Sequence, residues 1–141
     1  MANSTINVDI VSAEGEIYSG LASMVFVPAS QGEIGIAPRH APLLTLLKAG
    51  EVRVQAADGE EHAFYVGGGA LEVQPQRVTV LADTALRAKD LDEAAALAAK
   101  QRAEELLLEK GEQISIAEAQ AELLRAIAQL KMLERLRKVR K

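Results

Sequence analysis

The first half of the chain alternates hydrophobic and polar residues with the period of two that is typical of half-buried β-strands. Ile6, Val8 and Ile10 alternate with polar residues, and Glu14-Gly15 then supplies a turn. Further short strands are predicted at 24–27, 43–47, 52–56, 63–66, 71–73 and 78–80. Many short strands at regular spacing predict a β-sandwich, which we place at residues 1–86.

Two of the connections between these strands have the residue types of hairpin turns. Asp58-Gly59 is one, because both residues tolerate the positive φ that tight turns require. Gln74-Pro75-Gln76-Arg77 is the other, and its proline belongs in the turn. Gly67-Gly68-Gly69 lacks the Lys-Ser/Thr of a phosphate-binding loop. We therefore predict a strand kink there, with a bulge or close backbone approach.

Residues 32–44 differ from the strands around them, because they contain two glycines and two prolines within thirteen residues. Glycine allows backbone angles that other residues resist, whereas proline fixes φ and removes an amide donor. We therefore predict a shaped loop between strands. Its polar residues, Glu33, Arg39 and His40, lie among apolar residues that anchor the loop to a core. Such a loop favours docking over catalysis.

After Ala85 the composition changes to good helix formers, which only Gly111 interrupts. We predict helices near 90–110 and 115–138, which form an antiparallel hairpin in a second region, 87–141. Gly111 suits the end of the first helix. Both predicted helix starts have the spacing of a capping box: Asp90 with Glu93, and Ser115 with Glu118.

The second predicted helix is amphipathic, whereas the first is rich in alanine. Apolar residues recur on the second helix at three- and four-residue steps: Ile116, Ala119, Leu123, Ile127, Leu130 and Leu133. The first helix has alanine at 94, 95, 96, 98, 99 and 103. Small side chains let helices approach closely but bury little area. The pairing should be marginal in stability, which makes the hairpin a candidate moving element.

Composition argues against several classes of function. A net charge of −4, with 3% aromatic residues and no Trp, gives little with which to bind nucleic acid. The absence of Cys excludes thiolate chemistry and fits the cytoplasm. His40 and His62 are the only histidines and neither has a cluster of carboxylates nearby, so we predict no metal site, and we expect His62 to be solvated. No set of residues supplies nucleophile, base and oxyanion donors for an enzyme.

Neither end of the chain suggests insertion in a membrane. The first residues lack the basic and apolar regions of a signal peptide, and no apolar run approaches the ~20 residues of a membrane span. Any membrane association is therefore expected through a partner. Residues 131–141 carry six basic residues and one acidic residue, on a chain that is acidic overall. This basic end is either a solvated helix terminus or a surface that docks onto an acidic partner.

Several strings in this sequence resemble those of one family. Residues 32–44, which read GEIGIAP-x-HAPLL around position 39, resemble the signature loop of the epsilon subunit of bacterial F-type ATP synthases. The likeness continues in Val11-Ser12-Ala13-Glu14, Gly68-Gly69, Leu71-Glu72-Val73-Gln74-Pro75 and Val80-Leu81-Ala82-Asp83-Thr84-Ala85. The order and spacing of these strings cover nearly the whole chain.

The resemblance implies a non-catalytic rotor subunit in the central stalk of a proton-translocating ATP synthase. The sandwich would hold the gamma subunit and rest on polar loops of the c-ring, at the cytoplasmic face of the bacterial inner membrane. The hairpin would either fold onto the sandwich or extend along gamma and inhibit ATP hydrolysis by the alpha/beta hexamer. The interface candidates are Glu33 and His40 on the loop and Arg125, Arg135, Arg137 and Lys138 on the second helix.

Some members of this family bind ATP through Ile/Leu-Asp-x-x-Arg-Ala at the start of the first C-terminal helix. The corresponding string here is Leu91-Asp92-Glu93-Ala94-Ala95-Ala96, in which Ala95 replaces the arginine. Asp92 and, two turns beyond Ala95, Arg102 are the weak nucleotide candidates, and no cofactor is expected. Asp92 is otherwise explained as a carboxylate at a helix start.

A second class of function stays open at this point. The chain could be a free-standing β-sandwich adaptor that recruits partners through its amphipathic hairpin. Co-purification with a ring and a hexamer would separate this class from a rotor subunit.

Overall fold

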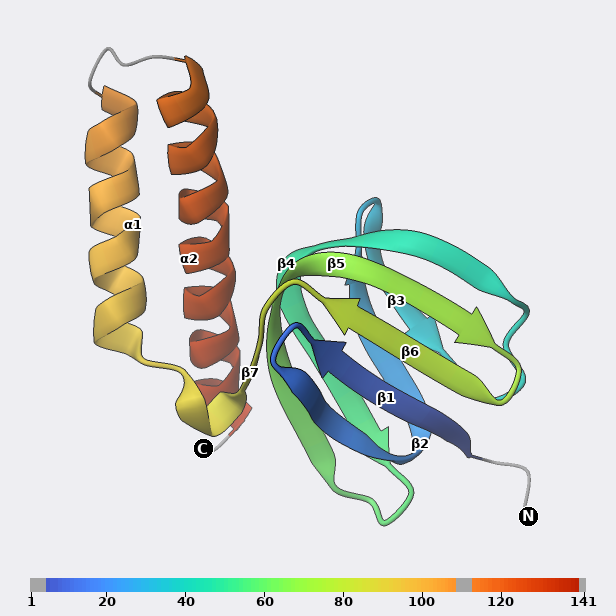
Figure 1. Ribbon diagram of the computed structural model, residues 1–141. Helices are drawn as coiled ribbons and strands as arrows, with labels where there is room; N and C mark the ends of the chain where they lie inside the picture. The colour runs from blue at the N-terminus through green and yellow to red at the C-terminus, as the bar shows by residue number, and fades with distance from the viewer. Residues whose placement is uncertain (1–4, 109–112, 140–141) are drawn as a thin grey trace. The chain divides into compact units, whose positions relative to one another are not determined.

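The computed structural model describes residues 5–108 and 113–139. The chain divides into two compact units, Met1–Lys89 and Asp90–Lys141 (Figure 1). The strands lie in the first unit and two α-helices in the second. The predicted architecture, a β-sandwich followed by two C-terminal helices, is confirmed. The predicted boundary at residue 86 falls within the last strand.

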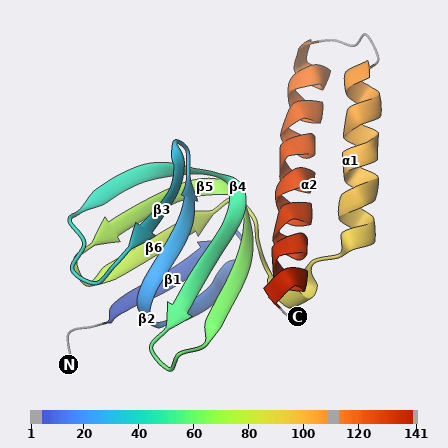
Figure 2. The same cartoon turned by 180° about the vertical axis from the view of Figure 1, so that it is seen from behind.

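The first unit contains seven described strands in one hydrogen-bonded sheet of order β1-β6-β5-β4-β2-β3, with β7 paired to β5. Their bounds are β1 Ile6–Ser12, β2 Gly15–Ala29, β3 Gly32–Ile36, β4 Leu43–Ala56, β5 Glu61–Gln74, β6 Arg77–Ala82 and β7 Ala85–Arg87. β1 pairs with β6 in parallel and with β2 antiparallel, so the circuit β1-β6-β5-β4-β2 closes on itself. The long strands curve around the domain to achieve this (Figures 1 and 2).

The core lies inside this closed circuit and follows from the alternation in the sequence. On β1, Ile6, Val8 and Ile10 are buried while their neighbours are not. The same alternation on β4, β5 and β6 supplies most of the remaining core: Val52, Val54, Phe64, Val66, Leu71, Val73, Val78 and Val80. His62, predicted to be solvated, is half-buried instead, with its ring centroid 5.2 Å from that of Tyr18. Burial, and then the charge of Asp58, raise the pKa of Tyr18.

The glycine run 67–69 bends a strand without ending it. The segments 63–66 and 71–73 are therefore one strand, β5, and not the two that were predicted. Gly68 and Gly69 have φ of 110° and 137°. A Cβ on Gly69 would lie 2.1 Å from the backbone oxygen of Leu81 on β6. The predicted kink with close backbone approach is confirmed. Segments 43–47 and 52–56 likewise form the single strand β4.

The predicted loop at 32–44 is only partly a loop. Its first five residues form the strand β3, which pairs with β2 from Val25↔Ile36 to Ala29↔Gly32. Gly32 has φ of 136°, so the chain can turn back tightly after β2 and reach this pairing. Residues 37–42 remain irregular, and Arg39 there has φ of 65°. The Arg39 amide donates to the carbonyl oxygen of Pro75 at 2.9 Å, which ties this loop to the β5–β6 turn.

The Asp58-Gly59 hairpin turn is confirmed between β4 and β5, but its two residues act differently. Gly59 adopts the positive φ, 92°, whereas Asp58 is not among the described residues with positive φ. Instead the Asp58 carboxylate accepts a hydrogen bond of 2.9 Å from the Glu60 amide. The side chain of Asp58 therefore stabilises the turn that Gly59 permits.

The helices begin and end within a few residues of the predicted positions. α1 covers Glu93–Leu108 and α2 covers Gln113–Val139. Asp90 does not cap α1, because it ends a short 3-10 helix, Ala88–Asp90. The cap is Asp92, whose Oδ1 accepts from the Ala95 amide at 3.2 Å. Gly111 and the side chain of Ser115 lie outside the described residues, so their predicted roles remain predictions.

Alanines occupy the most buried positions of the hairpin. Among the residues of the two helices whose burial the structure describes, the buried ones are Ala96, Ala103, Ala119, Ala126 and Met132. The predicted stripe on α2 is therefore shifted: Ala119 is buried, but the larger apolar members of that stripe are only half-buried. Ala126 and Met132, which the stripe left out, are buried in their place. Leu97, Leu106, Leu108 and Leu124 remain exposed.

Candidate functional site

The signature loop presents Glu33 on the outer face of β3. Alternation along β3 turns Ile34 and Ile36 inward and Glu33 outward. An ion pair holds the Glu33 carboxylate, because Arg53 Nη2 on β4 donates to its Oε1 at 2.8 Å. The side chains of Arg53 and Glu33 are 24% and 55% exposed. Glu33 is thus a carboxylate with a fixed position and not a freely rotating one.

Arg53 is itself fixed by an aromatic ring. Its guanidinium carbon lies 4.5 Å from the ring centroid of Phe26, a cation–π geometry. Phe26 on β2 pairs directly with Arg53 on one side and with Gly35 of β3 on the other. Three neighbouring strands therefore build the support beneath Glu33.

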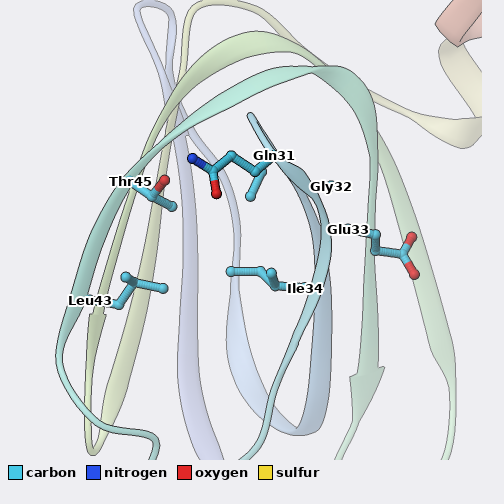
Figure 3. Close-up of a pocket in the computed structure, with 7 residues that line it drawn as sticks. Gln31, Gly32, Glu33, Ile34, Leu43 and Thr45 are labelled. Carbon is cyan, nitrogen blue, oxygen red and sulfur yellow. The ribbon is translucent and has the colours of Figure 1, made fainter.

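A hollow of about 360 Å³ lies beside β3, and Glu33 is among the residues that line it. Figure 3 shows the side chains of Ile34, Leu43 and Thr45 around it, while the Glu33 carboxylate points away from them. His40 follows in the loop, half-buried, with Nδ1 2.7 Å from the carbonyl oxygen of Ala41. The two loop candidates therefore differ: Glu33 offers a charged group, whereas His40 has a ring nitrogen engaged by its own loop.

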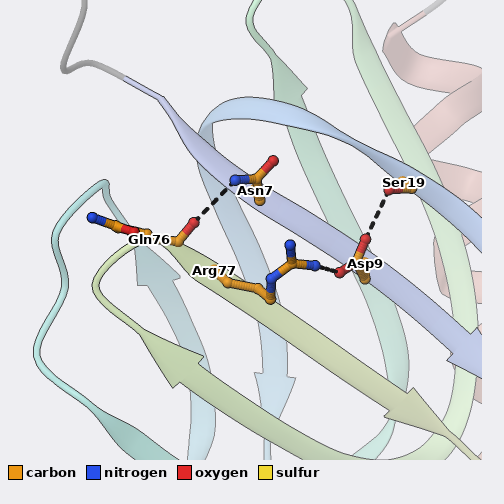
Figure 4. A network of polar contacts seen from close by, with 5 residues as sticks. All are labelled: Asn7, Asp9, Ser19, Gln76 and Arg77. Atoms are coloured by element: carbon orange, nitrogen blue, oxygen red, sulfur yellow. Dashed lines mark hydrogen bonds and ion pairs between the residues drawn. The ribbon is translucent and has the colours of Figure 1, made fainter.

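A separate polar network crosses the sheet at β1 (Figure 4). Asp9 accepts a hydrogen bond from Arg77 of β6 and another, of 2.8 Å, from Ser19 Oγ of β2. Asn7 Nδ2 donates to the carbonyl oxygen of Gln76 at 3.4 Å. These contacts join the three strands that close the circuit. We therefore assign them a role in stabilising the sandwich.

On the hairpin, an ion pair joins the basic end of α2 to the first turn of α1. Arg137 Nη2 donates to Glu93 Oε2 at 2.5 Å. The hydrogen bond and the charge of Glu93 raise the pKa of Arg137. Lys138 lies 3.5 Å from Glu134, one turn away. Both basic side chains are exposed.

The remaining predicted residues are distributed along the two helices. Arg125 is exposed and Arg135 half-buried on α2, while Arg102 is exposed on α1. Asp92 is occupied as the cap of α1. Within residues 5–108 and 113–139, no group of three His, Asp or Glu side chains could hold a metal ion. None of the helices described there is long and apolar enough to cross a membrane.

Two family models match successive parts of the chain. The ATP synthase, Delta/Epsilon chain, beta-sandwich domain matches residues 5–88, and the corresponding long alpha-helix domain matches 89–134. A relative named ATP synthase epsilon chain, from Nitrosococcus oceani, is 64% identical over 134 residues, which are 95% of this chain and 96% of the relative. This chain belongs to the ATP synthase epsilon-chain family.

A second relative agrees with this assignment, and a solved structure shows the same fold. The epsilon chain of Halorhodospira halophila is 61% identical over 136 residues and 96% of both chains. A chain of the mitochondrial ATP synthase of Euglena gracilis has the same fold, with a TM-score of 0.84 and 17% identity over 92% of this chain and 82% of that one. The predicted family is therefore confirmed, and the chain is a non-catalytic subunit of an ATP synthase.

Sequence reasoning missed Arg53 and Phe26. Arg53 is a polar residue in an alternating strand, and nothing along the chain links it to a glutamate twenty positions earlier. The available signal was Gly35, whose place within a strand indicates close approach by a neighbouring group. A Cβ there would lie 3.2 Å from Phe26 Cε1 and 2.8 Å from Met24 Cε.

Proposed function

We propose that this chain is a rotor subunit of the central stalk, which couples rotation of the c-ring to the catalytic head. Its sandwich binds the gamma subunit and rests on the polar loops of the c-ring. Family membership over nearly the whole chain supports this role. So do two solved chains of like fold, one from the OSCP/F1/c-ring assembly of the Euglena gracilis mitochondrial ATP synthase and one from the central stalk/c-ring of the Tetrahymena thermophila enzyme.

One observation on the sandwich carries the proposal. Three leucines on the outer face of β4 and β6 are exposed. The exposed fractions of Leu44, Leu46 and Leu81 are 75%, 67% and 50%. Leu46 pairs across the sheet with Ala70, and Ala70 with Leu81, so two of the leucines share one row. A contiguous exposed apolar patch is unfavourable in water and marks a protein contact. We assign this patch to the gamma subunit.

The hairpin is proposed to inhibit ATP hydrolysis when it extends. The net positive end of α2, which includes Arg137 and Lys138, then docks on an acidic segment of the alpha/beta hexamer. The small alanines between the helices support the idea of a hairpin that opens at modest cost, because each buries little apolar area. The proposed setting is the cytoplasmic face of the bacterial inner membrane, which the chain reaches through the c-ring.

Purification tests the rotor role and the domain boundary together. A tagged chain and a version ending at Lys89 should both recover gamma and the c-ring from native membranes, because the proposed contacts lie on the sandwich. The short version should also unfold in one cooperative thermal transition. Recovery of other proteins without a ring or hexamer would favour the free-standing adaptor. If the short version shows no cooperative transition, the proposed domain boundary is wrong.

Nucleotide binding is proposed to be weak. Ala95 stands exposed in the first turn of α1, where the motif of some relatives has arginine, and Asp92 is engaged as the cap. Ala95→Arg adds a charge-assisted contact and should tighten ATP binding about tenfold. Calorimetry on the purified chain measures this. Micromolar affinity of the unchanged protein that Asp92→Ala does not reduce would contradict the proposal.

A further inference from the structure

We propose that Arg53 is a positioning residue for subunit contact: it holds Glu33 in the orientation in which the loop meets a hydrogen-bond donor on the c-ring. This rests on the proposed rotor function. Arg53 does not touch the partner itself. Its effect on binding passes entirely through the Glu33 carboxylate.

The contacts on the outer face of the sandwich support these two roles, in which Arg53 positions the carboxylate and Glu33 binds the partner. An isolated glutamate on an edge strand samples several rotamers, and binding must then stop that motion. Here Arg53 Nη2 occupies Oε1 at 2.8 Å, while Glu33 remains 55% exposed. The second oxygen, Oε2, therefore stays available to a donor from outside, already oriented by the bond to the first.

The support under Arg53 explains a glycine of the signature loop. Gly35 does not have a positive φ, so its role is not backbone freedom. Its missing side chain leaves room for Phe26 and Met24, whose atoms would lie 3.2 and 2.8 Å from a Cβ at that position. Phe26 can then lie beneath the guanidinium, with the Arg53 guanidinium carbon 4.5 Å from its ring centroid.

The pair also defines the chemistry of the partner group. Arg53 compensates the charge of Glu33, so the pair offers an oriented acceptor and little net charge. An amide, hydroxyl or ammonium donor on a polar loop meets this requirement, whereas a carboxylate does not. The expected contact is a directional hydrogen bond with Oε2.

A double-mutant cycle on the full chain tests the proposal, with the detergent-solubilised c-ring–gamma subcomplex as the probe. Arg53→Met keeps the stem and removes the donor, and Glu33→Gln removes the charge. Each should weaken binding about 3- to 10-fold. The double variant should be no weaker than the weaker single variant, because both changes disable one acceptor. Arg77→Met, which breaks the ion pair with Asp9, is the matched control and should bind normally.

Each departure from this result has one meaning. Unchanged binding by Arg53→Met, or additive losses in the double variant, would overturn the positioning role and leave the rotor function intact. Failure of the unchanged chain to bind the subcomplex would overturn the rotor function itself. If Arg53→Met lacks a cooperative unfolding transition, Glu33→Asp decides instead, because its shorter side chain keeps the charge but cannot reach Arg53. Binding by Glu33→Asp equal to that of the unchanged chain would then overturn the proposal.

Discussion

Gly69→Ala should lower the free energy of unfolding of the sandwich by about 3 kcal/mol or more. Two costs combine at this position. Gly69 has φ of 137°, which side chains rarely adopt, and its new Cβ would lie 2.1 Å from Leu81 O and 2.9 Å from Ala82 Cα. Both obstructing atoms belong to the backbone of β6, so no side chain can move aside. Relief requires the β5–β6 pairing to separate.

Gly32→Ala is the matched control for this experiment. Gly32 has nearly the same φ, 136°, but nothing lies within 4 Å of its Cβ position. It should therefore carry only the backbone strain, on the order of 1–3 kcal/mol. Urea titrations followed by tyrosine fluorescence measure the sandwich selectively, since Tyr18 and Tyr65 are the only tyrosines and Trp is absent. Equal losses in the two variants would show that the contact with β6 contributes nothing.

Replacing Arg135, Arg137, Lys138 and Arg140 by Glu should raise ATP hydrolysis by the assembled enzyme about fivefold or more. In the proposed inhibited state these side chains meet an acidic segment of the hexamer, and reversing four charges turns attraction into repulsion. Assembly should survive, because the sandwich contacts are unchanged. Steady-state hydrolysis in the reconstituted complex is the measurement, and inhibition by the unchanged chain should weaken as ionic strength rises.

Glu93→Gln should act in the opposite direction and serves as the control. In the closed hairpin Arg137 donates to Glu93 at 2.5 Å, so the charge of Glu93 favours the closed form. Removing it frees Arg137 for the hexamer and should deepen inhibition. A different result would contradict the role of charge. If the enzyme with the four Glu substitutions remains inhibited while deletion of the hairpin restores hydrolysis, contacts by apolar residues of α2 such as Leu130 and Leu133 explain the inhibition better than charge does.

The sequence predicted elements whose cause is local. Alternation placed the strands, and Asp58-Gly59 located a hairpin, because each depends on neighbouring residues only. Prediction from the sequence failed where pairing between strands decided the secondary structure. Residues 32–36 have the glycine content of a loop, yet they form β3 because β2 offers a free edge to pair with. The capping residue was misplaced by two positions for a related reason: Asp90 and Asp92 both suit a cap, and the preceding 3-10 helix selects Asp92.

The candidate contact residues show the same division. Glu33 could be selected from its loop with the help of the family resemblance, and Arg135, Arg137 and Lys138 from their charge. The partners of these groups could not be predicted, since Arg53 lies 20 positions from Glu33 and Arg137 lies 44 from Glu93. Such pairs arise from strand order and from helix packing. A single sequence carries no local pattern for either.

The closed circuit of strands also dictates when the sandwich can form during synthesis. β1 leaves the ribosome before the other described strands, and it can pair with β2 at once through a short turn. Its other edge pairs with β6, whose residues 77–81 follow about 70 positions later. Until then β1 offers an open edge to other nascent chains. The circuit closes only after β6 has been synthesised, so β1 keeps this edge unpaired while all the strands between them are made.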